Sequence, residues 1–174
     1  MRLIINSGDY MEYIYIGKIV NTHGIKGEVR ILSDFKYKDK IFKKGFNIYI
    51  GKDKINKVIN SYRYHKVFDM ITMEGINNIN DVLIYKGKNV FVNREDIKLD
   101  DNEYLDSDLI GLKVIVNDKV VGVVSDYIKD RYQDKIVVNK DEKEYLVPNV
   151  SGIIRSINLK DGNILVEDIK GLLD

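Results

Sequence analysis

The feature that most constrains this chain is a short turn between two glycines, Gly24 and Gly27, with an apolar strand-forming run on either side. Runs of this kind that meet at a glycine-rich turn predict two antiparallel strands. Glycine suits such a turn because it accepts a positive φ and the close approach of other groups. Ile25 is apolar inside this otherwise polar turn, so we expect it to point back into a core. His23 and Lys26 would then be displayed beside an open backbone.

The turn differs from the phosphate loop of nucleoside triphosphatases. That loop requires G-x-x-x-x-G-K-[ST] between a strand and a helix. Here Glu28 follows Gly27, and the chain continues from Val29 as a strand. The sequence therefore disfavours nucleotide hydrolysis, and an ordinary β-hairpin remains the structural interpretation of the turn.

Length and composition define the class of protein. The 174 residues suffice for one ordinary domain or two small ones, and 44 % hydrophobic residues allow real cores. The absence of cysteine excludes disulfides and thiolate metal sites and favours a reducing compartment. No apolar run approaches the ~20 residues of a membrane span, and no signal peptide is visible. We therefore expect a cytoplasmic protein that does not enter a membrane.

Charge is distributed unevenly along the chain. Residues 1–100 contain 18 Lys and Arg against 12 Asp and Glu, whereas residues 101–174 contain 10 against 15. Opposite signs in the two halves suggest two modules with different partners. The basic half is suited to phosphates and the acidic half to a basic protein.

The first module is predicted to be a small β-barrel. Residues 12–93 consist mainly of short strands bounded by turn residues, six in all. A helix is expected over residues 76–86, with Asn77 as its N-cap and Gly87 as its terminator. Residues 1–11 do not follow this pattern and are expected to form a loose extension.

The second module is also predicted to be built of strands. Residues 94–107 are polar and contain the charge reversal, so they are interpreted as a linker. In residues 108–174 the pattern predicts three consecutive hairpins, over residues 112–127, 135–147 and 153–167. Three hairpins can curl into a second barrel. The predicted fold class is therefore all-β, with two small barrels joined by a linker.

Several motifs resemble those of one known family. Residues 17–29, G-K-I-V-N-T-H-G-I-K-G-E-V, resemble the N-terminal signature of the RimM family of ribosome maturation factors. The family's other short motifs are resembled by residues 75–87, 103–104, 108–111, 147–148 and 171–173. The resemblance implies a six-stranded, translation-factor-like N-terminal barrel with one short helix, and a C-terminal PRC barrel.

The sequence departs from the family pattern at two places. The family usually has two adjacent tyrosines before the second barrel, where this chain has Tyr104-Leu105. The common Pro-Phe step is Pro148-Asn149 here. Tyr104 keeps an aromatic contact for a partner, whereas Leu105 has no hydroxyl to donate.

The resemblance implies a non-enzymatic assembly chaperone of the small ribosomal subunit. Its partners would be a ribosomal protein of the subunit head, small-subunit protein nineteen, and the immature subunit with its 16S rRNA. It would assist folding and processing of the head rRNA and act as a monomer without a cofactor. The alternatives are a general RNA-binding module without a ribosomal protein partner, an RNA-modifying enzyme, and a lone PRC-barrel subunit.

Catalytic chemistry has few candidate residues. The chain has two histidines, His23 and His65, far apart in sequence, and no cysteine. A triad or a metal site needs several such groups together. Adjacent carboxylates lie in predicted turns, where their side chains point apart. We therefore predict no catalytic residue, no metal and no cofactor.

The candidate binding residues are basic or aromatic. His23 can hold the turn through backbone hydrogen bonds, or it can join Lys26 in meeting RNA phosphate or a partner carboxylate. The strongest electrostatic candidates for phosphate contact are Lys36, Lys38, Lys40, Lys43 and Lys44. The same run is also typical of a solvated loop. The interleaved aromatics, Phe35, Tyr37 and Phe42, can stack on bases or anchor the loop, and Tyr62 and Tyr64 have the same two interpretations.

Overall fold

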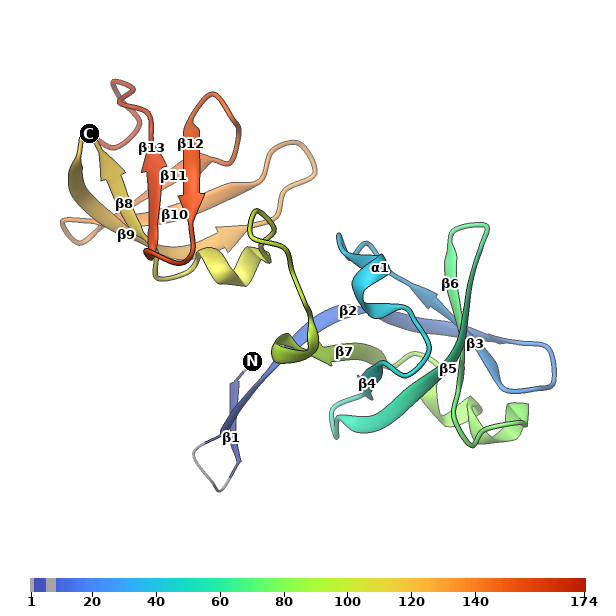
Figure 1. Ribbon diagram of the computed structural model, residues 1–174. Helices are drawn as coiled ribbons and strands as arrows, with labels where there is room; N and C mark the ends of the chain where they lie inside the picture. Colours follow the sequence, from blue (N-terminus) through green and yellow to red (C-terminus); the bar gives the residue numbers. More distant parts are fainter. Residues whose placement is uncertain (1, 6–8) are drawn as a thin grey trace. The chain divides into compact units, whose positions relative to one another are not determined.

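The computed structural model describes residues 2–5 and 9–174, and the chain divides into two compact units, one ending at Asp100 and the other beginning at Asp101 (Figure 1). Each unit is built around its own sheet. The predicted all-β fold with two modules is confirmed. The predicted linker, residues 94–107, contains a 3₁₀ turn at each end, η3 (Arg94–Asp96) and η4 (Asp106–Leu109).

The first unit is a six-stranded closed barrel with one added strand. Its strands are β1 (Arg2–Ile5), β2 (Asp9–His23), β3 (Glu28–Leu32), β4 (Asn47–Ile50), β5 (Ile55–His65), β6 (Phe68–Met73) and β7 (Asn89–Asn93). Their order is β1-β2-β3-β6-β5-β4-β7, and a further pairing of β2 with β7 closes the ring. The predicted six-stranded barrel therefore corresponds to β2–β7.

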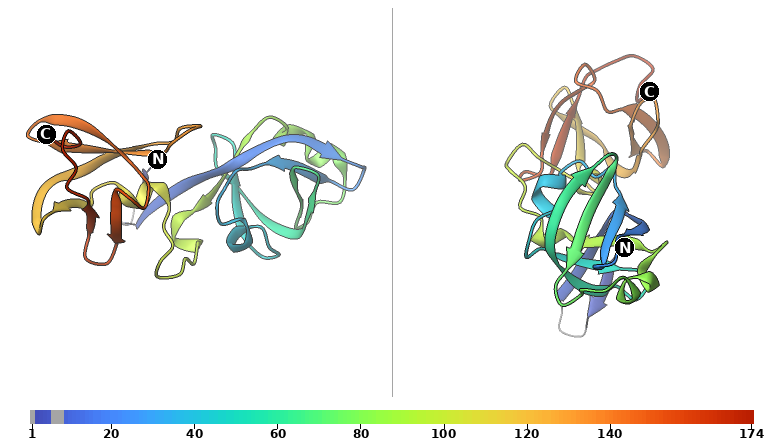
Figure 2. Two further views of the ribbon diagram at one scale, coloured as in Figure 1. Left: turned by 90° about the horizontal axis from the view of Figure 1, so that it is seen from above. Right: turned by 90° about the vertical axis from the view of Figure 1, so that its right-hand side faces the viewer.

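The long strand β2 organises this barrel, and Figure 2 shows it as the extended blue strand. It pairs with β7 over Tyr13–Lys18 and with β3 over Lys18–His23. Gly17 lies at a register shift in this strand. A Cβ there would lie 2.6 Å from the carbonyl oxygen of Leu32, so only glycine allows β3 to come this close.

The start of β2 pairs with β1. Arg2–Ile5 runs antiparallel to Asp9–Glu12. The prediction that residues 1–11 form a loose extension covers this hairpin. It also covers residues 1 and 6–8, which lie outside the described part of the chain. Protection of the hairpin amides against hydrogen exchange tests that prediction.

The prediction of a helix over residues 76–86 is wrong. This segment forms two 3₁₀ turns, η1 (Ile79–Asp81) and η2 (Leu83–Tyr85), and Asn78 rather than Asn77 accepts the capping hydrogen bond. Val82 and Tyr85 are buried three residues apart, which is the repeat of a 3₁₀ turn. The α-helix of the described residues is instead α1 (Lys38–Ile41), where Ile41 is buried.

The second unit is a six-stranded sheet that curls around one core. Its strands are β8 (Lys113–Val116), β9 (Lys119–Ile128), β10 (Lys135–Lys140), β11 (Lys143–Pro148), β12 (Ile154–Asn158) and β13 (Asn163–Val166). Their order is β11-β10-β9-β8-β13-β12, with β8 and β13 parallel. All six strands contribute side chains to the same apolar cluster. The three predicted hairpins are confirmed as β8–β9, β10–β11 and β12–β13.

Two of these hairpins turn through residues with positive φ. Asn117 and Asp118 have φ values of 48° and 62°, and Asp141 and Glu142 have 52° and 63°. Two successive positive φ values define the type I′ turn, whose twist matches that of the flanking strands. No helix among the described residues is long and apolar enough to cross a membrane.

Candidate nucleic-acid interface

The glycine-bracketed turn is held through its backbone. Gly24 and Gly27 have φ values of 64° and 86°. A Cβ on Gly27 would lie 3.0 Å from Cγ2 of Ile76, so the glycine permits close packing on the segment that follows β6. The amide of Ile79 donates to the carbonyl of Ile25 over 3.0 Å. The expectation that Ile25 points into a core is wrong, because its carbonyl faces the protein and its side chain is 78 % exposed.

His23 contacts a side chain rather than the turn backbone. Its Nδ1 lies 2.8 Å from Nη2 of Arg30, which donates the hydrogen bond. The Arg30 guanidinium in turn lies 5.7 Å from the ring centroid of Phe68. His23 therefore fixes an arginine on the outside of the barrel, while Lys26 stays exposed in the turn. A role for either residue toward a partner stays a prediction.

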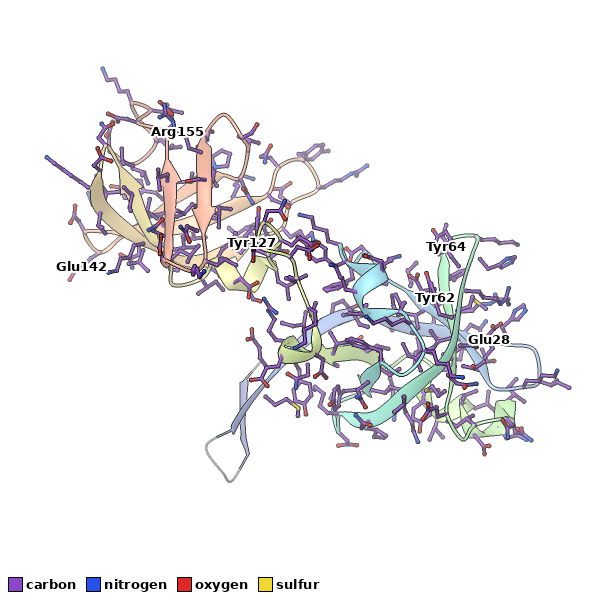
Figure 3. All side chains as sticks on the ribbon, in the orientation of Figure 1. Glu28, Tyr62, Tyr64, Tyr127, Glu142 and Arg155 are labelled. Atoms are coloured by element: carbon purple, nitrogen blue, oxygen red, sulfur yellow. The ribbon has the colours of Figure 1, made fainter. Side chains whose placement is uncertain are left out.

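An ion pair ties two strands together on this same outer face. Two of the guanidinium nitrogens of Arg63, Nε and Nη2, donate to Glu28, at 2.9 and 2.6 Å. The hydrogen bonds from Arg63 hold the pKa of the Glu28 carboxyl below its usual value, although burial opposes them. Figure 3 labels Glu28 in this part of the barrel.

The members of the lysine run differ in how far they are exposed. Nζ of Lys38 lies 2.7 Å from Oδ2 of Asp69, which has no exposed surface. The Tyr62 hydroxyl donates to the other oxygen of Asp69 over 2.8 Å. Burial, and then the bond to Asp69, raise the pKa of Tyr62 far above its ordinary value. Lys38 therefore fastens α1 to the β5–β6 hairpin.

The other lysines of the run lie toward solvent. Lys40 is only partly exposed and pairs with Asp100 over 3.2 Å. Lys36, Lys43 and Lys44 are exposed, and Nζ of Lys36 lies 5.3 Å from the ring centroid of Tyr37. The run is thus partly a structural device and partly a solvated basic surface.

Burial distinguishes the aromatic side chains that anchor the loop from those that are exposed for stacking. Tyr37 and Phe42 are buried and therefore anchor the loop, and Phe35 packs edge-to-face on Tyr37 with its ring centroid 6.3 Å away. Tyr62 and Tyr64 are instead exposed, by 37 % and 58 %. Their spacing of two residues is the sequence signal that could have placed both rings on one face of a strand. The packing of α1 beside them could not be foreseen from the sequence.

Tyr104 lies in the second unit beside a shallow groove. It packs, half-buried, against the apolar core of that unit. The groove has a volume of about 410 Å³, and its lining includes Asp101, Glu103, Tyr104 and Arg155. Leu105 is buried, and its amide donates to Oδ2 of Asp108 over 2.8 Å. The leucine at this departure from the family pattern therefore serves the interior, and the partner role of Tyr104 stays a prediction.

Titratable side chains of the candidate site are engaged in ion pairs of the fold. No group of three His, Asp or Glu side chains within residues 2–5 and 9–174 is placed to hold a metal ion. Two carboxylates of the first unit, the buried Asp69 and the half-buried Glu28, are each held by a cation of the fold. The first unit presents to solvent a basic surface with two tyrosines, and the second unit presents a groove whose lining includes Asp101 and Glu103.

Comparisons with known proteins find a family match for each of the two units. Residues 14–97 match the model of the RimM N-terminal domain, and residues 106–172 match that of the RimM PRC barrel domain. A ribosome maturation factor RimM from Staphylococcus haemolyticus is 41 % identical over 166 residues, covering 92 % of this chain and 99 % of that one. The protein of the same name from Exiguobacterium is 33 % identical, covering 94 % and 98 %.

Among solved structures, the chain is similar to a 16S ribosomal RNA processing protein RimM from Pseudomonas aeruginosa. The two are 23 % identical, with a TM-score of 0.41 over 90 % of this chain and 97 % of that one.

Proposed function

The chain belongs to the RimM family of ribosome maturation factors, and we propose that it is a non-enzymatic assembly chaperone of the small ribosomal subunit. It holds a ribosomal protein of the subunit head, small-subunit protein nineteen, while it contacts the immature 16S rRNA. Each contact limits the conformations that the unfinished head can sample. This role places the protein, acting as a monomer, in the cytoplasm, where immature subunits are found.

The observation that carries this proposal is the separation of charge between the two units. Up to residue 100 the chain has 18 basic and 12 acidic side chains, and beyond it 10 and 15. Phosphate neutralisation provides most of the affinity of proteins for nucleic acids, so the first unit suits the rRNA. Ribosomal proteins that bind rRNA are basic, so the second unit suits such a protein.

The groove beside Tyr104 is the candidate place on the second unit for the protein partner. Its lining joins the half-buried ring of Tyr104 to Asp101 and Glu103, together with Arg155, which pairs with Glu167. Aromatic anchors inside a charged rim are typical of protein interfaces with strong local contributions. The groove therefore combines the aromatic and acidic features that a basic partner requires.

The test measures binding of the full-length protein to purified small-subunit protein nineteen, with Asp101→Lys as the variant. Glu144→Lys is the matched control, because it makes the same charge change at an exposed position of β11 outside the groove. We expect Asp101→Lys to weaken binding about tenfold, whereas Glu144→Lys binds nearly as the unmodified protein does. Equal effects of the two variants would contradict the groove as the binding place.

A second measurement separates the alternatives. After RNase treatment, a pull-down should still retain the head protein; loss of every ribosomal protein favours a general RNA-binding module. Turnover of immature rRNA by the purified protein would favour an RNA-modifying enzyme instead.

A further inference from the structure

We propose that Tyr64 forms a stacking site for an unpaired base of single-stranded RNA, with Tyr62 beside it and Lys36, Lys43 and Lys44 as its phosphate contacts. We call these five residues the tyrosine–lysine surface. The inference rests on the proposed function and deepens it, because it names where the first unit receives RNA and which state of the RNA it recognises.

The end of the β5–β6 hairpin presents the two tyrosines together. In its register Tyr62 lies opposite Ile71 and Tyr64 opposite Asp69. Directly opposed residues share one face of a sheet, and Tyr62 donates to the buried Asp69 and stacks on the buried Phe42, so both rings lie on the core-facing side. Both rings are nevertheless exposed to solvent, because the β5–β6 hairpin ends here (Figure 3 labels both tyrosines).

Side chains of the segment around α1 contact both tyrosine rings. The ring of Phe42 stacks on Tyr62, with centroids 5.4 Å apart and an interplanar angle of 12°. Nζ of Lys38 lies 5.6 Å from the ring centroid of Tyr64 while it is held by Asp69. Both rings are therefore oriented before a ligand arrives, which lowers the entropic cost of binding.

Exposure distinguishes the two rings. The Tyr62 hydroxyl donates a hydrogen bond to Asp69, and the Tyr62 ring stacks on Phe42. Tyr64 is instead more than half exposed. A base that stacks on such a ring strengthens binding about five- to hundredfold relative to a truncated side chain. Tyr64 is thus the platform, and Tyr62 supports it.

The charges of the segment around α1, which reaches Tyr64 through Lys38, favour a polyanion. Residues 34–44 contain five lysines against Asp34 and Asp39. Lys38 and Lys40 are the less exposed members, whereas Lys36, Lys43 and Lys44 are exposed to solvent. Lys43 directly follows the phenylalanine that stacks on Tyr62. A basic ribosomal protein would be repelled here, so RNA is the favoured occupant.

The absence of tryptophan from the chain provides a direct assay. In the full-length Tyr64→Trp variant the new indole is a unique reporter, and we expect a decamer of uridylate or adenylate to quench it. Tyr132→Trp is the control, because Tyr132 is 88 % exposed but lies in the second unit, next to Arg131 and close to Asp130 and Asp134. Its fluorescence should stay unchanged at the same RNA concentration.

Two further variants test the contributions separately. Tyr64→Leu should weaken decamer binding about five- to hundredfold, and Tyr64→Phe should bind nearly as tightly as the unmodified protein. Replacement of Lys36, Lys43 and Lys44 by alanine should reduce the slope of log affinity against log salt by about 2. Alanine at Lys18, Lys52 and Lys86, also exposed lysines of the first unit, should leave that slope nearly unchanged.

The outcomes separate this inference from the proposed function. If RNA does not quench the indole of the Tyr64→Trp variant while the same protein still binds immature small subunits, the stacking site is refuted and the chaperone role stands. A response of this indole to purified small-subunit protein nineteen rather than to RNA also refutes the stacking site. If RNA quenches the indole but the same protein binds neither immature subunits nor the head protein, the stacking site is supported and the chaperone role is refuted.

Discussion

The ion pair between Lys38 and Asp69 predicts an unequal response to removal of its two partners. The Asp69 side chain has no exposed surface, whereas that of Lys38 is 29 % exposed. In Lys38→Met the carboxylate stays buried, with the hydroxyl of Tyr62 as its remaining side-chain donor. In Asp69→Asn the new amide oxygen still accepts from Tyr62, and the ammonium can turn toward water.

The expected magnitudes follow from this difference. Removal of one partner from a buried pair costs about 3–5 kcal/mol when the other charge is stranded, and Lys38→Met belongs to this case. Asp69→Asn should cost about 1–2 kcal/mol, close to a lost charged hydrogen bond. The double variant should be more stable than Lys38→Met alone by about 2 kcal/mol, because no charge remains stranded. Lys40→Met, which removes an exposed pair with Asp100, should cost at most about 1 kcal/mol.

Urea unfolding of the full-length protein, followed by NMR signals from each unit, measures these costs. Lys38→Met should lower the midpoint of the first unit by about 2 M and leave that of the second unit unchanged. The reasoning is refuted if Lys38→Met and Lys40→Met shift the midpoint equally, or if Asp69→Asn is the more damaging change of the buried pair.

Two further predictions concern single contacts in the two units. Arg63→Gln should raise the pKa of Glu28, because the hydrogen bonds of Arg63 lower that pKa and burial opposes them. A carboxyl whose pKa is lower in the folded than in the unfolded state stabilises the fold above the unfolded-state pKa, and this stability is lost as pH falls through the folded-state pKa. The variant should therefore lose less stability than the unmodified protein on acidification below about pH 4.5. An unchanged NMR titration of Glu28 would contradict this. Gly122→Ala should destabilise the second unit alone by about 1–3 kcal/mol, since its Cβ would lie 2.5 Å from the carbonyl oxygen of Asn139. A second-unit urea midpoint equal to that of the unmodified protein would show that β10 can move aside.

Much of the fold was predictable because strands and tight turns leave local signals. Alternating apolar residues and turn dipeptides such as Asn117-Asp118 predict each hairpin of the second unit, and the structure confirms all three. The segment 76–86 has apolar residues at helical spacing, yet it forms 3₁₀ turns. Tertiary contacts determine its conformation, since the amide of Ile79 bonds the carbonyl of Ile25 and the buried pair is three residues apart.

The candidate site was less predictable, because its residues depend on contacts across the barrel. The lysine run is visible in the sequence, but a buried Asp69 that engages Lys38 is 31 residues away. The sequence likewise offered Phe42 and Tyr64 as equal stacking candidates. Burial of Phe42 under Tyr62 and exposure of Tyr64 distinguish them only in the folded chain. Local composition predicts the kind of site, and packing selects the residues.

A stacking platform on one unit and a protein groove on the other would make the chaperone sensitive to the state of the RNA. Two linked contacts bind more tightly than either alone, by about 10²–10⁴ in favourable geometry. Tyr64 can hold only a base that is free of its own partners, because a paired and stacked base is enclosed by its neighbours. When the head RNA completes its helices, that base is withdrawn and the gain from linkage disappears. The chaperone would then be held by the protein contact alone, so under this proposal completion of the RNA fold itself would favour its release.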